Sequence, residues 1–322
     1  MPRLILKRGF PFILTVTVMT YHNPVLANEV AGLAAGRARG VDCTAGGGGH
    51  TALLLEAGLA VFAVDRDPEA VAVLRDRFAP SQVTVVEGRF ADSFILGEIG
   101  RFQPDLVLLD LGVSSRQIDT ESRGFSFRPG VALDMRMTPG AGATAAEFLA
   151  SATEADLARI FKEYADEPRG RRLAREIVRR REGTPFTSSD DLVNAIRAVL
   201  GGRSGPSDFA RLFQAVRIAV NDELAELEVA LVATRDALAP GGLLAVISYH
   251  SGEDRMVKHA FRNWGRECVC PPRQPVCTCR GRALGRVETR KAVLQTPDEI
   301  AENPRARSAK LRVFRKADEA QG

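Results

Sequence analysis

Short apolar runs alternate with amphipathic segments along the first third of the chain, a pattern typical of strands joined by helices. A first strand should end at Cys43, and further strands are expected at 60–65, 82–86 and 105–110. The last of these is apolar throughout, as in a strand buried on both faces. Pro68 opens a helix after the second strand, because proline is favoured at an early helical position. These elements predict a parallel sheet.

The pattern becomes helical after the fourth strand. Thr144, Thr153 and Ser188 each precede an acid by three residues, which is the capping-box spacing at the start of a helix, and no strand-like run occurs at 151–200. A fifth strand is expected at 240–248, and 287–294 and 310–314 should form a last antiparallel edge pair. We therefore predict an α/β fold, a doubly wound seven-stranded sheet with an inserted all-helical domain. Its parts are a leader outside the fold (1–18), the first sheet segment (19–118), the helical insertion (119–210) and the second sheet segment (211–322).

A glycine-rich loop follows the first strand at 46–49, and Asp65 stands at the tip of the second strand, 19 residues after Gly46. Glycines let the backbone approach a ligand closely, and a carboxylate at that tip can bind both ribose hydroxyls. A dinucleotide fingerprint would need glycine or alanine where Thr51 stands, and His50 would crowd a bound pyrophosphate. The loop therefore favours S-adenosylmethionine, which has no phosphate, over NAD. His50 has no second ligand nearby and is not predicted to bind metal.

Length and composition fit a two-module enzyme: 322 residues, 45% hydrophobic, with a net charge of only +4. The charge is uneven, because residues 255–316 hold 16 Lys and Arg against five Asp and Glu, which leaves the rest of the chain net negative by seven. A second basic run lies at 169–181. Both zones suggest contacts with phosphates, although the second could equally be a solvated helix face.

The first 18 residues imitate a signal peptide, with three basic residues before an apolar run, but no cleavage site follows and the run is too short to span a bilayer. Our hypothesis is that Met19 is the initiator and that 1–18 are either not expressed or a disordered tail. A natural protein whose mass includes Met1 would refute it. No other segment is apolar enough to cross a membrane.

Nine ordered motifs along 21–316 give the chain a specific resemblance. They include HNPVL at 22–26, DCTAGGGGH at 42–50, DRDP at 65–68, LDLGVSS at 109–115, RGFSF at 123–127, DMRM at 134–137, FQAVRI at 213–218, SYHSGEDR at 248–255 and NPRARS at 303–308. With these motifs the chain resembles the bacterial 16S ribosomal RNA cytosine-N4 methyltransferases (RsmH, formerly MraW).

The resemblance implies a Rossmann-like, S-adenosylmethionine-dependent methyltransferase sheet and methylation of the exocyclic N4 amine of cytidine 1402 in 16S RNA. It implies 16S ribosomal RNA as the partner, within the small ribosomal subunit, and a cytoplasmic enzyme whose helical insertion recognises RNA. The oligomeric state stays open. The implied cofactor-binding residues are Gly48, Gly49, His50, Asp65, Phe90, Asp110 and Gln117.

Methyl transfer to an exocyclic amine needs alignment and an acceptor for the N4 proton, because the nitrogen lone pair is delocalised into the ring. The target base must also leave any stack to reach the site. The Asn/Asp/Ser-Pro-Pro-aromatic motif of many DNA amino-methyltransferases is replaced here by Asp110-Leu-Gly-Val, so their mechanism does not transfer. Our catalytic candidates are Asp110, Ser114, His250 and Glu253; His250 could equally be a structural hydrogen-bonding node.

C5 methylation would instead need a cysteine nucleophile. Cys43, beneath the glycine loop, is expected to pack in the core, and the other cysteines are far along the chain from the fourth strand. These four, Cys268, Cys270, Cys277 and Cys279, form a C-x-C, C-x-C cluster that could hold structural zinc. The alternative is free thiols in a basic loop, since a disulfide is not expected in the cytoplasm.

A reading from a different class is a non-catalytic RNA-binding or assembly factor that keeps the sheet only as a scaffold. Cofactor affinity separates the two readings, because a scaffold need not bind S-adenosylmethionine and Asp65→Ala should leave its function intact.

Overall fold

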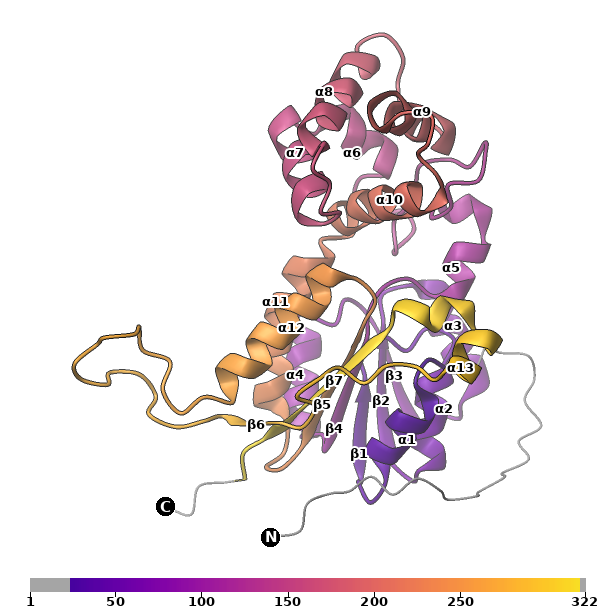
Figure 1. The fold of residues 1–322 in the computed structure, drawn as a ribbon. Helices are drawn as coiled ribbons and strands as arrows, with labels where there is room; N and C mark the ends of the chain where they lie inside the picture. The colour runs from indigo at the N-terminus through magenta and orange to yellow at the C-terminus, as the bar shows by residue number, and fades with distance from the viewer. Residues whose placement is uncertain (1–23, 319–322) are drawn as a thin grey trace.

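The computed structural model describes residues 24–318, so the predicted leader lies outside the described residues. Its described part contains a seven-stranded sheet in the order β3-β2-β1-β4-β5-β7-β6 (Figure 1). The strands are β1 (Arg39–Asp42), β2 (Ala60–Asp65), β3 (Val83–Glu87), β4 (Leu106–Asp110), β5 (Leu243–Ser248), β6 (Gly285–Val287) and β7 (Lys310–Lys316). The first five are parallel, and β7 pairs antiparallel with both β5 and β6. The predicted α/β, doubly wound class is confirmed.

Helices cover both faces of the sheet because its central strands are apolar on both sides. Along β4, Leu106 and Leu108 belong to one buried cluster, and Val107 and Leu109 to the other, as the two-residue period of a strand requires. The first face is covered by α1 (Ala27–Ala34), α2 (Gly49–Glu56) and α3 (Pro68–Arg77). The second is covered by α4 (Ser93–Phe102), α11 (Glu223–Ala237) and α12 (Ser251–Trp264).

The last two strands pair antiparallel as predicted, but the predicted limits of the first and the edge position of the second were wrong. The strand expected at 287–294 ends at Val287, and beyond it only Val293 makes an isolated bridge, to Leu311. The Thr289 hydroxyl accepts the Val313 N–H at 2.9 Å, a bond that a strand carbonyl would otherwise make, so the ladder stops. The other strand, β7, is not at the edge but lies between β5 and β6, where Phe314 packs against Phe261.

Between β4 and β5 the described chain forms helices with no named strand: α5 (Ser115–Asp119), a 3₁₀ turn (Glu121–Arg123), α6 (Ala145–Ser151), α7 (Glu154–Glu163), α8 (Gly170–Arg181), α9 (Ser189–Leu200) and α10 (Pro206–Asn221). The predicted caps are confirmed at Thr144, Thr153 and Ser188. A third buried cluster, running from Leu133 to Val216, gives α6–α10 a core of their own, and we call these helices the helical module (Figure 1).

The predicted domain limit at residue 210 falls inside α10, so the division at 119–210 stays a prediction. After β6 the chain adds α13 (Pro297–Glu302) and a 3₁₀ turn (Pro304–Ser308) before β7. Within residues 24–318, none of the helices combines the length and the apolar character needed to cross a membrane.

Candidate functional site

A cavity of about 720 Å³ opens at the carboxyl ends of β1, β2 and β4, where a doubly wound sheet binds its ligands. That volume suits a ligand of nucleoside size or larger. Six of the seven predicted cofactor residues line it: Gly49, His50, Asp65, Phe90, Asp110 and Gln117. Ser114 and Glu253 line it as well, whereas Gly48 and His250 are not among its lining residues.

Gly48 serves the architecture of the glycine loop. It precedes α2 with φ of 79°, a left-handed conformation that favours glycine. A Cβ at this position would come within 2.6 Å of the ring of Phe78, at the end of α3. Gly46, Gly47 and Gly49 line the cavity, so the backbone can approach a ligand on either side of Gly48.

Asp65 is held rigidly at the tip of β2. Its Oδ2 accepts the Gly46 N–H at 2.7 Å, and its Oδ1 accepts the Asp67 N–H at 2.8 Å. Burial nevertheless raises the pKa of Asp65 to about 6, because these bonds replace only part of the lost hydration. Each carboxylate oxygen retains a lone pair, so a cis-diol could donate to both.

Asp67, which the sequence did not single out as a site residue, organises the wall opposite. It begins α3 by accepting the Glu69 N–H, and its Oδ2 also accepts from Gln117 Nε2 at 2.9 Å and from Arg123 Nη1 at 2.8 Å. Gln117 in turn uses its Oε1 to accept the Ser114 N–H at 3.0 Å. Both ends of the Gln117 amide are thus engaged within the protein, so it positions the wall.

Ser114 is the N-cap of α5, and its hydroxyl accepts the Gln117 N–H at 3.2 Å. Together with the return bond from Gln117, this completes a capping box. The hydroxyl predicted for catalysis therefore has a structural task at the edge of the cavity.

Asp110 lies at the tip of β4 between two ring side chains. Its Oδ1 accepts from the Tyr249 hydroxyl at 2.9 Å, and its Oδ2 is 3.5 Å from His50 Nδ1. Because His50 Nε2 is 2.9 Å from the Val25 carbonyl, which can only accept, Nε2 carries the proton and Nδ1 faces Asp110 as an acceptor when the ring is neutral. Burial raises the pKa of Asp110 to about 6, against the opposing charge of His50.

The turn before α1 that holds His50 through the Val25 carbonyl is itself bound by a helix near the far end of the chain. The Leu26 N–H donates to Glu299 Oε1, on α13, at 2.6 Å. Val25 and Leu26 are both buried. The turn that sets the tautomer of His50 is thus bound to a residue near the other end of the described chain.

The contacts of His250 are those of a structural hydrogen-bonding node, the alternative given above for this residue. It is the N-cap of α12, and its Nδ1 accepts the N–H groups of Gly252 and Glu253 at 3.2 and 3.3 Å. Its Nε2 is 3.1 Å from Glu253 Oε1, while Glu253 Oε2 accepts the Tyr249 N–H at 2.8 Å. Burial would raise the pKa of Glu253, but the charge and hydrogen bond of His250 outweigh it and lower that pKa. This pair therefore positions Tyr249 at the cavity.

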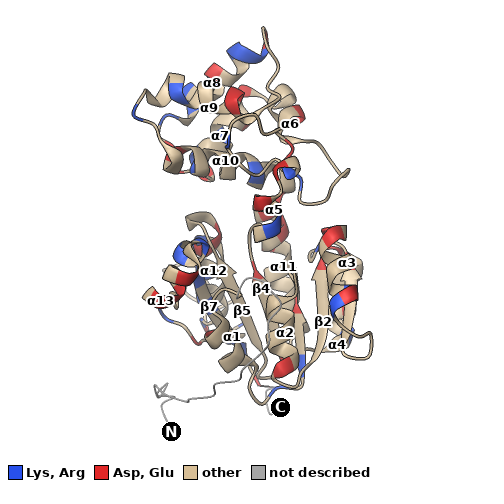
Figure 2. Cartoon of the chain, turned by 90° about the vertical axis from the view of Figure 1, so that its right-hand side faces the viewer, with Lys and Arg blue, Asp and Glu red and all other residues tan. Residues whose placement is uncertain are grey.

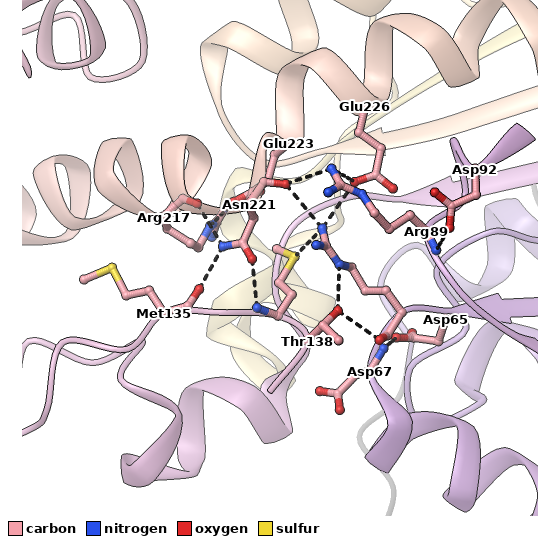
Figure 3. Close-up of polar contacts among 12 residues, drawn as sticks. Asp65, Asp67, Arg89, Asp92, Met135, Thr138, Arg217, Asn221, Glu223 and Glu226 are labelled. Atoms are coloured by element: carbon pink, nitrogen blue, oxygen red, sulfur yellow. Dashed lines mark hydrogen bonds and ion pairs between the residues drawn. The ribbon is translucent and has the colours of Figure 1, made fainter. Parts of the chain in front are cut away.

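A polar network ties the sheet to the helical module beside the cavity (Figure 3). Glu226 on α11 forms ion pairs with Arg66 at 3.2 Å and Arg89 at 3.1 Å, at the tips of β2 and β3. The Asn221 side chain, at the end of α10, accepts the Met137 N–H and donates to the Met135 carbonyl, both at 2.8 Å. Glu226 Oε1 is buried without a hydrogen-bond partner among the described residues.

The basic run at 169–181 is largely paired within the helical module, where Figure 2 colours the basic positions of α8 blue. Arg179 and Arg180 both form ion pairs with Glu176, and Arg181 donates to the carbonyls of Leu149 and Ala152. Arg171 and Arg172 are exposed on the same helix. The solvated-face interpretation fits the paired arginines, and phosphate contact stays a prediction for the exposed ones.

Sequence reasoning missed Asp67, Arg123 and Tyr249 as site residues. All three lie in motifs quoted for the resemblance, DRDP, RGFSF and SYHSGEDR, so their position was visible but their roles were not. Arg123 reaches Asp67 from 56 residues away, a contact that only the tertiary fold creates.

The chain is similar to known proteins along most of its length. The model of the MraW methylase family matches residues 19–317. The ribosomal RNA small subunit methyltransferase H of Gemmatimonas aurantiaca is 58% identical over 302 residues, covering 92% of this chain and 96% of that protein. Its counterpart from Heliobacterium mobile is 45% identical and covers 92% and 99%. Among solved structures, an rRNA methylase from Streptococcus thermophilus is 12% identical, with a TM-score of 0.39 and coverage of 91% and 94%.

Proposed function

Because the chain belongs to the MraW methylase family, we propose that it transfers a methyl group from S-adenosylmethionine to the exocyclic N4 amine of a cytidine in 16S ribosomal RNA. The resemblance seen in the motifs is thereby confirmed at the level of the family. The observation that carries the proposal is the cavity at the strand ends, with a half-buried carboxylate at each of two tips, Asp65 and Asp110. By the same resemblance, the target is cytidine 1402.

The residues present fit the cofactor. Asp65 offers two fixed carboxylate oxygens for the ribose hydroxyls, Gly46 and Gly47 leave room beside them, and Phe90 supplies an apolar face for the adenine. When bound, S-adenosylmethionine supplies an electrophilic methyl group on a sulfonium. The Asp67–Gln117–Arg123 contacts hold the wall that the ligand would meet.

Asp110 is the proton acceptor in this proposal. Tyr249 holds Oδ1, so Oδ2 can accept an N4–H as the N4–methyl bond forms and the sulfonium–methyl bond breaks. The proton then passes to His50 Nδ1, 3.5 Å away, while His50 Nε2 keeps its bond to the Val25 carbonyl. Ser114, His250 and Glu253 are positioning residues in this scheme, because their polar atoms cap helices α5 and α12.

In this proposal the RNA contacts the protein surface around the cavity. The helical module, including the exposed Arg171 and Arg172, lies beyond the carboxyl ends of the strands (Figure 1), and Arg305 of the basic C-terminal third lines the cavity. Binding should weaken steeply with salt, because contacts to phosphates release counterions. We propose an assembled small subunit in the cytoplasm as the substrate form.

The test incubates purified protein and methyl-labelled S-adenosylmethionine with small subunits lacking the modification, with naked 16S RNA and with DNA, each then digested to nucleosides. Label in N4-methylcytidine is expected, and the preferred substrate shows what the basic surfaces recognise. Label in 5-methylcytidine would overturn the chemistry. Failure of the protein to bind the cofactor, with Asp65→Ala harmless to function in the cell, would favour the scaffold.

The role of Asp110 needs its own comparison. Asp110→Asn should keep cofactor binding but lower the rate of a single turnover by about 10²–10⁴-fold, the usual contribution of general-base catalysis. The matched control is Asp236→Asn, at an exposed acid on α11 that lies outside the cavity. An Asp110→Asn enzyme with the wild-type rate would refute the proton transfer.

A further inference from the structure

Residues 265–284, between α12 and β6, form a long loop with no helix or strand. None of its side chains is buried, and the apolar Val276 is 70% exposed. Fixing the backbone of such a segment costs about 1–2 kcal/mol per residue, which buried apolar area normally offsets. The loop therefore needs another source of order.

Four thiols converge inside this loop although nothing apolar drives them together. Cys277 Sγ lies 3.8 Å from Cys268 Sγ, 3.9 Å from Cys270 Sγ and 3.5 Å from Cys279 Sγ. Cys279 Sγ is 3.9 Å from Cys268 Sγ, and all four sulfur atoms lie within 4.8 Å of one another. The four cysteines are free thiols, so no disulfide explains the convergence.

These separations match the edges of a metal–thiolate tetrahedron. With a zinc–sulfur bond of about 2.3 Å, tetrahedral geometry places neighbouring sulfurs about 3.8 Å apart. We propose that Cys268, Cys270, Cys277 and Cys279 bind one structural Zn²⁺ ion that folds the loop. All four ligands come from the protein, which leaves no open position for substrate or water, and none of these four cysteines lines the cavity.

The surroundings suit a site with an excess of thiolate charge. The Val269 N–H donates to Cys279 Sγ at 3.3 Å, and Arg273, Arg280 and Arg282 add positive charge in the same loop. Arg280 also donates to the carbonyls of Asn263 and Arg266, so the site is anchored to the end of α12. A zinc-ordered loop would present its arginines as a fixed surface beside the catalytic module.

The test measures metal in the full-length protein, purified in reducing buffer without added metal and again after zinc addition and removal of excess. About one zinc per chain is expected, and replacement by Co²⁺ should give the intense visible absorption of tetrahedral cobalt bound to thiolates. Cys268→Ser and Cys277→Ser should each lose most of the zinc, whereas the matched control Val276→Ser, at an exposed non-ligand position in the same loop, should keep it.

A second readout does not depend on the variants. Chelation of the wild-type protein should unfold the loop and so speed tryptic cleavage after Arg273, while cofactor binding is retained because the four cysteines lie outside the cavity. Wild-type protein that takes up no zinc or cobalt under reducing conditions would overturn the proposal. So would a mass that shows disulfides among these cysteines, or full zinc content in both cysteine variants. None of these results bears on methyl transfer, so the two proposals fail independently.

Discussion

Removing one hydroxyl, by Tyr249→Phe, tests how the fold sets the acidity of Asp110. The hydroxyl donates to Asp110 Oδ1 at 2.9 Å and favours the ionised carboxylate, whose pKa burial has raised to about 6. A hydrogen bond to a charged group contributes about 1.5–3 kcal/mol, and one pKa unit corresponds to about 1.4 kcal/mol. Without the bond, the pKa of Asp110 should rise by about one to two units.

The sign follows from the proposed role. Asp110 must be ionised to accept the N4 proton, so activity is lost as the pH falls through its pKa. In the wild type this loss should fall near pH 6, and in Tyr249→Phe it should move to higher pH. At neutral pH the variant should be several-fold slower, and the rate should recover at higher pH.

The assay is the pH dependence of a single methyl-transfer turnover, with saturating cofactor and RNA. Tyr164→Phe is the matched control, because its hydroxyl bonds only Arg159 on the helical module, outside the cavity. An unshifted acid limb in Tyr249→Phe would refute the reasoning. A rate lowered equally at every pH would show damage to the site rather than a change in acidity.

Three further predictions concern the cofactor pocket and its supports. Asp65→Asn should weaken S-adenosylmethionine binding, measured by calorimetry, roughly ten- to hundredfold. In the wild type the affinity should fall as the pH drops through about 6, because Asp65 becomes protonated, and the variant should not show this fall. Equal wild-type affinity above and below pH 6 would contradict this prediction. Gly48→Ala should lower the free energy of unfolding by about 1–3 kcal/mol, because the new Cβ would meet Phe78 and the backbone there is left-handed. The control Gly97→Ala, in α4 with open space around it, should not lower the free energy of unfolding. Equal melting temperatures of the two variants would count against this prediction. Glu226→Gln should cost about 1–3 kcal/mol of stability in denaturant titrations, since Arg66 and Arg89 lose a shared charge, and an unchanged midpoint would exclude a stabilising role for the network.

The parallel half of the fold could be predicted because its signal is local. Strands β2, β3 and β4 begin and end within a residue of their predicted limits, since each is an apolar run closed by a polar residue. The antiparallel end was harder. The Thr289 side chain accepts a hydrogen bond from the Val313 N–H and so interrupts the β6–β7 ladder. The pattern of apolar and polar residues in the sequence does not predict such a contact.

The candidate site also contains residues that the sequence could predict and residues that it could not. Asp65 and Asp110 were predictable, because strand order brings the tips of parallel strands to one edge. Ser114 and His250 were predicted to be catalytic, but their polar atoms cap the first turns of helices α5 and α12. This capping role can be recognised in the sequence only once the helix limits are known. Tyr249 was hidden because its partner, Asp110, lies 139 residues away.

The contact between Leu26 and Glu299 also bears on how the enzyme is made. A ribosome delivers the glycine loop, His50 and Asp110 long before Glu299 and β7, and β7 must insert beside β5 before the sheet is complete. A growing chain therefore contains the reacting groups before it contains Glu299, whose hydrogen bond to Leu26 holds the turn beside His50. We expect the nascent protein to stay inactive until synthesis ends, so that a truncated product of translation cannot modify the machinery that made it.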